Sequence, residues 1–221
     1  IPLSQHLGAP AKPVVKPGDI VKRNQLLGEP TGFISAPVHA PVGGKVTALT
    51  ETNTATGKIV PAIILEPSEN EEVEFLPRLD NWRKVDPATL IARIGDAGVV
   101  GMGGAGFPTR VKLSPPPQKR IDTVIINGAE CEPYLTADHR MMLEHAKEIR
   151  TGAEIIRHIL GAKTLRFAIE DNKPDAIEAM KQALQGIEGD VEVAILHTSY
   201  PQGAEKQQIY SVTERRMPQI G

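Results

Sequence analysis

The sequence contains a single cysteine, Cys131, among its 221 residues. One cysteine excludes an intrachain disulfide framework and any metal site built from several cysteines. The simplest setting for such a chain is a reducing, cytoplasmic one. Cys131 lies between Glu130 and Glu132, and two neighbouring carboxylates disfavour the thiolate, which is the reactive form. We therefore predict that Cys131 is neither a metal ligand nor a disulfide partner.

The chain also lacks long apolar runs and a strong charge of either sign. No apolar stretch approaches the length that spans a bilayer, and no signal-peptide pattern is present. The formal net charge of −2 gives no reason to expect nucleic acid as a partner. The first residue is not methionine, and no terminating pattern precedes Gly221. We therefore expect these residues to be a piece of a longer protein.

Prolines and glycines are plentiful and divide residues 1–68 into short apolar runs. This punctuation is typical of a small β domain. The segment resembles the barrel-sandwich fold of biotinyl and lipoyl carrier domains, in which a hairpin presents a modifiable lysine. The corresponding position falls near Phe33, and residues 31–35 contain no lysine, so we do not expect a swinging-arm carrier. His39 lies between apolar residues and is predicted to be a strand or turn histidine rather than a ligand.

A charged connector at residues 69–85 precedes a second predicted domain at residues 86–221. Asp86 and Pro87 fit a helix N-cap followed by proline at the first helical position. Gly95 or Gly98 is expected to end that helix.

Strands and helices alternate in the rest of the second domain. Apolar strands are predicted at residues 121–126, 164–169 and 191–196, and helices at 138–160, 174–184 and 203–212. This alternation predicts an α/β layer architecture with a parallel sheet. Right-handed crossovers then place the carboxyl ends of all three strands at one edge.

Polar loops follow these strands, at the edge where open α/β sheets bind ligands. They comprise residues 127–133, 170–172 and 198–206. In the middle loop, Asp171 or Asn172 is predicted to cap the following helix. The other two loops, rich in carboxylates and amides, favour a ligand site.

A glycine-rich stretch at residues 101–112 precedes the first of these strands, with four glycines within six residues and then a lysine. Glycine tolerates positive φ and lets the backbone approach a ligand closely. Successive backbone N–H groups form an anion-binding concavity, and a lysine adds a point charge for phosphate. A glycine-rich connection without a ligand is the alternative, since such motifs have false positives.

Three motifs in this order resemble one family of flavoproteins. They are Gly103-Gly104-Ala105-Gly106-Phe107-Pro108-Thr109 with Lys112, Asn127-Gly128-Ala129-Glu130-Cys131-Glu132-Pro133, and Tyr200-Pro201-Gln202-Gly203-Ala204-Glu205-Lys206. They resemble the FMN- and NADH-binding subunit of respiratory complex I, and more closely RnfC, the NADH-side subunit of the ion-translocating Rnf complex. Ile34-Ser35-Ala36-Pro37-Val38-His39-Ala40-Pro41 is also typical of RnfC. The resemblance implies a Rossmann-like FMN-binding domain preceded by a barrel-sandwich domain.

The resemblance also implies roles for individual residues. The positions expected to bind FMN are Gly101, Gly103, Gly104, Gly106, Lys112, Asn127, Glu130, Tyr200, Gly203 and Glu205. Those expected near NADH are Phe107 and Glu132. Three departures from the complex I motif remove polar contacts, since that family has arginine, aspartate and glutamate where this chain has Met102, Ala129 and Ala204.

The implied function is electron transfer between NAD(H) and ferredoxin, through FMN and iron–sulfur clusters, coupled to ion translocation. The implied location is peripheral, on the cytoplasmic side of the membrane, with other membrane subunits as partners. The two [4Fe–4S] clusters of RnfC are expected only in a missing carboxyl-terminal part, because this chain has one cysteine. The missing part is also expected to hold a final flavin-site segment, so residues 1–221 alone are expected to bind FMN weakly.

Two other interpretations stay open at this point. The chain also resembles related flavoproteins such as the cobalamin reductase of propanediol-using organelles. It resembles, too, the subunit of the sodium-pumping NADH:quinone reductase that keeps this fold without flavin, which would make it a scaffold.

Overall fold

The structure is a computed structural model that describes residues 1–54, 57–69, 72–102 and 105–217. Two compact units make up the chain, residues 1–117 and residues 118–221. The helix and the glycine-rich stretch that follow the connector belong to the first of these units. The predicted domain limits at residues 68 and 86 concern folding units and stay a prediction.

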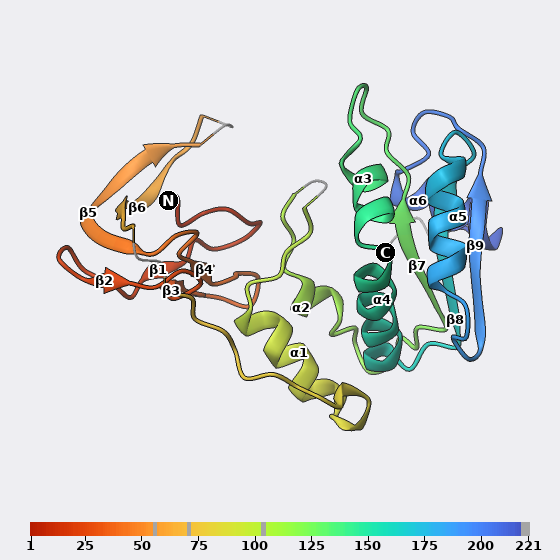
Figure 1. Cartoon of the computed structure of the whole chain (residues 1–221), viewed down its shortest axis with the longest axis horizontal. Coiled ribbons are helices and arrows are strands. Elements are labelled where there is room, and N and C mark those ends of the chain that lie inside the picture. Colours follow the sequence, from red (N-terminus) through yellow and green to blue (C-terminus); the bar gives the residue numbers. More distant parts are fainter. Residues whose placement is uncertain (55–56, 70–71, 103–104, 218–221) are drawn as a thin grey trace. The chain divides into compact units, whose positions relative to one another are not determined.

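The first unit begins with four short antiparallel strands and two longer ones (Figure 1). They are β1 (Lys12–Pro13), β2 (Ile20–Val21), β3 (Leu26–Glu29), β4 (Val38–His39), β5 (Gly44–Asn53) and β6 (Ile59–Pro67). One sheet has the order β1-β3-β4 and the other β2-β5-β6. Buried side chains of both sheets form one core around Leu27, Val46 and Ile63, each at 0% exposure. The two sheets thus pack into a barrel-like double layer that buries their apolar residues together.

The remaining elements of the first unit are helical: η1 (Trp82–Lys84), α1 (Pro87–Asp96) and α2 (Thr109–Lys112). Helix α1 begins as predicted, since Asp86 Oδ1 accepts a hydrogen bond from the Thr89 N–H at 2.9 Å. It ends before Gly98, which adopts a left-handed φ of +69°. Gly95 lies inside the helix and does not end it.

The second unit is an α/β layer with a three-stranded parallel sheet of order β7-β8-β9, as predicted. Its elements are β7 (Thr123–Gly128), α3 (Ala137–Glu144), α4 (Ala146–Leu160), β8 (Thr164–Glu170), α5 (Pro174–Ala183), β9 (Asp190–Leu196) and α6 (Glu205–Thr213). Leu165, Phe167 and Ile169 alternate along β8 and pack with residues of α3, α4 and α5. The parallel order brings the loops after the three strands to one edge (Figure 1).

The helix predicted at residues 138–160 is two helices in the structure, which corrects the prediction. His145 separates α3 from α4 with a non-helical φ of −129° and ψ of 30°. No proline or glycine marks this point in the sequence. Both helices contact α5 and β7, and α4 also contacts β8. The apolar spacing continues through residue 145 and does not report the break.

Candidate functional site

The base of the glycine-rich loop is closed by backbone hydrogen bonds within the first unit. The Gly101 N–H donates to the Phe107 carbonyl at 2.9 Å, and the Thr109 N–H donates to the Val99 carbonyl at 3.0 Å. Met102, which follows Gly101, has 95% of its surface exposed. Gly103 and Gly104, both predicted FMN-binding positions, lie outside the described residues. The two described ends of the loop are therefore paired with each other in a hairpin-like base.

Gly101 and Gly106 are glycines for different reasons. Gly106 has φ +64°, and a Cβ there would stand 3.1 Å from both the Gln5 carbonyl oxygen and the His6 Cα. The fold therefore requires glycine at 106. At Gly101 an added Cβ would meet only Phe107 backbone atoms, at 3.8 Å or more, and φ is not left-handed. Nothing in the described fold requires glycine at 101, whereas close approach of a ligand to the backbone would.

The same loop lines a cavity of about 750 Å³ within the first unit. Gly101, Met102 and Ala105 form part of its wall, and Lys58 supplies a cation. This volume lies within the range of about 300–1,000 Å³ that is typical of small-molecule sites. Lys112, at the end of α2, is exposed. Phe107, a predicted NADH contact, is half-buried at the base of the loop.

In the second unit, Asn127 at the end of β7 joins two of the polar loops. Its Nδ2 donates to the Gly203 carbonyl at 2.9 Å. Its Oδ1 accepts from the Ala129 N–H at 3.0 Å and from Gln208 Nε2 at 2.5 Å. Asn127 therefore fastens the loop after β7 to the loop after β9 and to α6.

Gly203 is needed for the close approach of these two loops. Its N–H donates to Cys131 Sγ at 2.8 Å. An added Cβ would stand 2.8 Å from that sulfur and 2.9 Å from the Ala129 carbonyl oxygen. On either side of this contact, Tyr200 is 83% exposed and Glu205 is exposed as the first residue of α6.

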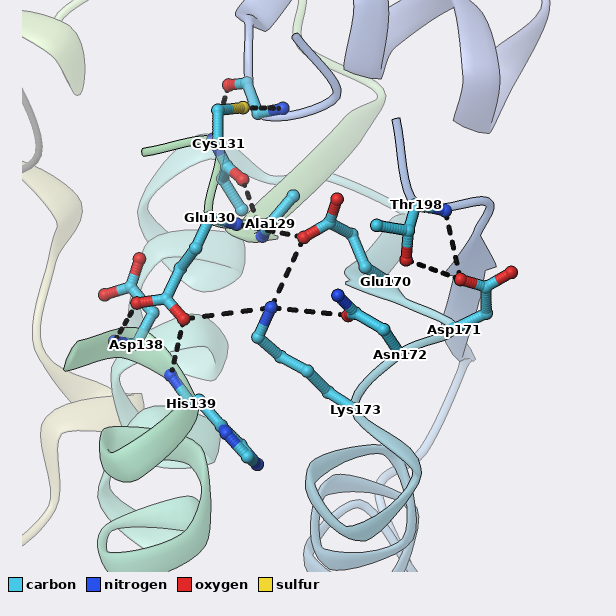
Figure 2. A network of polar contacts seen from close by, with 12 residues as sticks. Ala129, Glu130, Cys131, Asp138, His139, Glu170, Asp171, Asn172, Lys173 and Thr198 are labelled. Carbon is cyan, nitrogen blue, oxygen red and sulfur yellow. Dashed lines mark hydrogen bonds and ion pairs between the residues drawn. The ribbon is translucent and has the colours of Figure 1, made fainter. Parts of the chain in front are cut away.

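Glu130 lies in a buried network of charges at the same edge of the sheet. Figure 2 shows its carboxylate beside the Lys173 ammonium and the first turn of α3. Glu130 Oε1 accepts from the Asp138 N–H at 2.7 Å, and Oε2 accepts from the His139 N–H at 3.3 Å. A carboxylate at a helix N-terminus is favoured by the helix dipole and the unpaired N–H groups. Glu130 therefore holds α3 against the loop after β7.

Lys173 is the positive centre of this network. Its Nζ lies 3.4 Å from Glu170 Oε2 and 3.8 Å from Glu130 Oε2. The Lys173, Glu170 and Glu130 side chains are only 9%, 2% and 1% exposed. Glu170 Oε2 also accepts from the Glu130 N–H at 3.3 Å. One buried ammonium thus faces two buried carboxylates that come from different strand ends.

The excess of negative charge extends to Asp138. Burial raises the pKa of its carboxyl, and the charges of Glu130 and Glu132 raise it further, while Lys173 lowers it. Glu132, a predicted NADH contact, is itself exposed. The edge of the sheet therefore has a buried structural layer and an exposed acidic rim.

Asp171 joins the loops after β8 and β9 instead of capping α5, which corrects the predicted cap. Its carboxylate accepts from Thr198 Oγ1 at 2.6 Å, from the Thr198 N–H at 3.0 Å and from His197 Nδ1 at 3.1 Å. These bonds lower its pKa to about 2, with the Thr198 hydroxyl as the largest cause. Residue 173 is the N-cap of α5, and its side chain makes no capping bond.

The structure thus places the predicted residues in two groups. Asn127, Glu130 and Gly203 lie together at one edge of the second unit, whereas the glycine-rich loop and Lys112 belong to the first. Glu170 and Lys173 were not predicted as part of a site. Their spacing of three residues across a strand end allows an ion pair, but gives no sign of its burial.

Comparisons with known proteins match both parts of the chain. A family model described as the RnfC barrel sandwich hybrid domain matches residues 1–70, and one described as the Nuo51 FMN-binding domain matches residues 94–221. These matches define the class: a barrel-sandwich domain followed by an FMN-binding domain of the Nuo51 type. The chain belongs to the RnfC family. The predicted resemblance and fold class are therefore confirmed.

Curated relatives have closely similar sequences. The chain is 46% identical over 222 residues to the C subunit of the proton-translocating ferredoxin:NAD(+) oxidoreductase complex of Clostridium ljungdahlii, covering 100% of this chain and 48% of that protein. It is 45% identical over 219 residues to the Na(+)-translocating counterpart of Acetobacterium woodii, covering 99% of this chain and 49% of that protein. The chain thus spans about half the length of these relatives.

A solved structure supports the fold alone. The crystal structure of an NAD+-reducing [NiFe]-hydrogenase in the air-oxidized state matches with a TM-score of 0.50 and 23% identity, over 57% of this chain and 24% of that chain. Within the described ranges, no helix combines the length and apolarity needed to cross a bilayer.

Proposed function

We propose that this chain is part of the NADH-side subunit of an ion-translocating ferredoxin:NAD oxidoreductase and binds FMN through its glycine-rich loop. The observation that carries the proposal is Gly101. It lies in the domain of the FMN-binding family, lines a cavity of about 750 Å³, and is a glycine that the described fold does not itself require. Bound FMN would accept two electrons from NADH and pass them on singly.

The residues on the two units have separate tasks in this proposal. Around the loop, Gly101 allows backbone approach, and Lys112 provides positive charge for the phosphate. At the sheet edge, Asn127 and Gly203 shape a surface for the flavin. The exposed carboxylate of Glu132 orients the nicotinamide amide, and Phe107 contributes an aromatic surface.

The partners follow from the same proposal. NAD(H) delivers or receives electrons at this chain, and ferredoxin or a ferredoxin-like subunit stands at the other end of the route. We expect the [4Fe–4S] clusters outside residues 1–221, since the chain has one cysteine and such clusters are held by several cysteine thiolates. The subunit is peripheral, on the cytoplasmic side of the membrane, and meets other subunits of the complex there.

One set of contacts fits a second candidate equally well, a scaffold of the same fold without flavin. Asn127 donates and accepts within the protein at both ends of its carboxamide, and Glu130 is bound to α3 and Lys173. Side chains so engaged support the fold whether or not a cofactor binds. Direct measurement of flavin binding separates the two candidates.

The test is titration of FMN into the full-length gene product. Binding is monitored through the quenching of flavin fluorescence. Lys112→Ala removes one charge-assisted contact worth about 1.5–3 kcal/mol, so the dissociation constant should rise about ten- to a hundredfold. Gly101→Val should weaken binding at least as much, because a branched side chain would fill the approach to the backbone. Lys45→Ala, an exposed lysine on β5, is the control. Wild-type protein that binds no FMN would establish the scaffold, and a Lys112→Ala variant equal to Lys45→Ala would refute the phosphate assignment.

A further inference from the structure

A side chain from α2 reaches the barrel-sandwich part of the first unit. Arg110 Nη2 donates to the Phe33 carbonyl at 2.7 Å and to the Gly32 carbonyl at 3.2 Å. Both carbonyls belong to the connection between β3 and β4. Arg110 stands four residues after Gly106, at the exit of the glycine-rich loop, so this contact ties the loop's exit to the barrel.

The connection that receives Arg110 is itself firmly held. Ser35 is 0% exposed, and its hydroxyl donates to the Ala9 carbonyl at 2.8 Å. The Ala9 N–H donates to the Ile34 carbonyl at 2.9 Å, and the Thr31 hydroxyl donates to the Pro10 carbonyl at 2.7 Å. The carbonyls at residues 32 and 33 are therefore presented from a fixed segment.

A second contact holds the loop just before its exit. The Leu7 N–H donates to the Gly106 carbonyl at 3.1 Å. At the left-handed Gly106 any side chain would be strained, and its Cβ would stand only 3.1 Å from Gln5 and His6 atoms. Both the amino-terminal segment and the β3–β4 connection thus hold the same short stretch of chain.

Helix α1 leaves room for the arginine to reach across. A Cβ on Gly95 would stand 2.7 Å from Arg110 Cδ. Glycine inside a helix is unfavourable relative to alanine, so the passage of Arg110 explains why a glycine occupies this helical position.

We propose that the barrel-sandwich part serves as a rigid mount for the glycine-rich loop, with Arg110 as the positioning residue. It holds the described carboxyl-terminal end of the loop, Gly106 to Arg110, in place before an anionic cofactor arrives, which lowers the entropy cost of binding. This inference rests on the proposed function for the identity of the ligand. The mount itself is a property of the chain without ligand.

The test combines two measurements on the full-length protein. Hydrogen exchange of the Gly101 and Thr109 amides without ligand reports how well the two ends of the loop are ordered. FMN titration reports how that order affects FMN affinity. In Arg110→Ala both amides should exchange several-fold faster, and the FMN dissociation constant should rise about tenfold, in line with the loss of a charged hydrogen bond. Arg110→Lys should restore little, because an ammonium cannot span two carbonyls as the guanidinium does.

Two further variants keep the result interpretable. Gly95→Ala retains the arginine and favours the helix, yet displaces Arg110, so it should change exchange and FMN binding in the same direction as Arg110→Ala. Arg78→Ala, the control, removes an exposed arginine of the same unit that pairs with Asp80 at the surface. Exchange rates in Arg110→Ala equal to those of Arg78→Ala would overturn the inference. Absence of FMN binding in the wild type would instead refute the proposed function. The hydrogen-exchange rates would still show whether Arg110 orders the loop.

Discussion

Replacing Lys173 with methionine tests whether the buried charge network stabilises the second unit. Methionine keeps most of the side-chain volume and removes the ammonium. Two carboxylates, 2% and 1% exposed, then lose their ammonium partner. Removing one partner of a buried ion pair typically costs about 3–5 kcal/mol, because the remaining charge is left desolvated and uncompensated. We expect a loss of that size in the free energy of unfolding.

The assay is urea unfolding followed by far-ultraviolet circular dichroism at the helix band, with the two units fitted as separate transitions. Lys181→Met, an exposed lysine on the same helix α5, is the matched control and should change stability little. The double variant Lys173→Met/Glu170→Gln also removes one of the two unpaired buried carboxylates. Its free energy of unfolding should be about 1–3 kcal/mol higher than the sum of the single-variant effects predicts. A Lys173→Met variant within about 1 kcal/mol of Lys181→Met would refute the network as a stabilising element.

Other features of the structure give four further expected outcomes. Gly203→Ala should lower the free energy of unfolding by about 1–3 kcal/mol through overpacking against Cys131 Sγ, measured by urea midpoint; a stability equal to wild type would show that the loops can separate freely. Asp171 has a pKa depressed to about 2 from 3.8, so its stabilising contribution is complete above the unfolded pKa and is lost as pH falls toward 2. The stability difference between wild type and Asp171→Asn should shrink over that interval, and a constant difference would contradict the assignment. Glu132→Gln should leave FMN affinity unchanged and reduce NADH oxidation, as measured by flavin titration and NADH-dependent dye reduction; unchanged NADH kinetics would remove Glu132 from the site. Limited proteolysis should cut first within residues 69–85, and prior cleavage within residues 101–112 or 34–46 would contradict the predicted domain limits.

Local chemistry made much of the fold predictable. The Asp86–Pro87 pair starts α1 because capping and a fixed φ act within one turn of the chain. The alternation of strands and helices after residue 121 predicted the parallel sheet, since parallel neighbours require a crossover. The three ordered motifs indicated the family, which the matches over residues 1–70 and 94–221 confirm.

The tertiary structure alone decided which of the predicted site residues also hold the fold together. Asn127 and Gly203 are bound to each other across 76 residues of sequence. Glu130 is buried with Lys173, and the helix predicted as continuous breaks at His145. Burial of a charge, and the absence of room for a Cβ, depend on what lies opposite in space. Sequence by itself therefore determined the elements, their order and the family. Folding determined which carboxylates face water and which are paired in the interior, because long-range packing sets solvent access. It also determined which glycines have space for a Cβ and which do not.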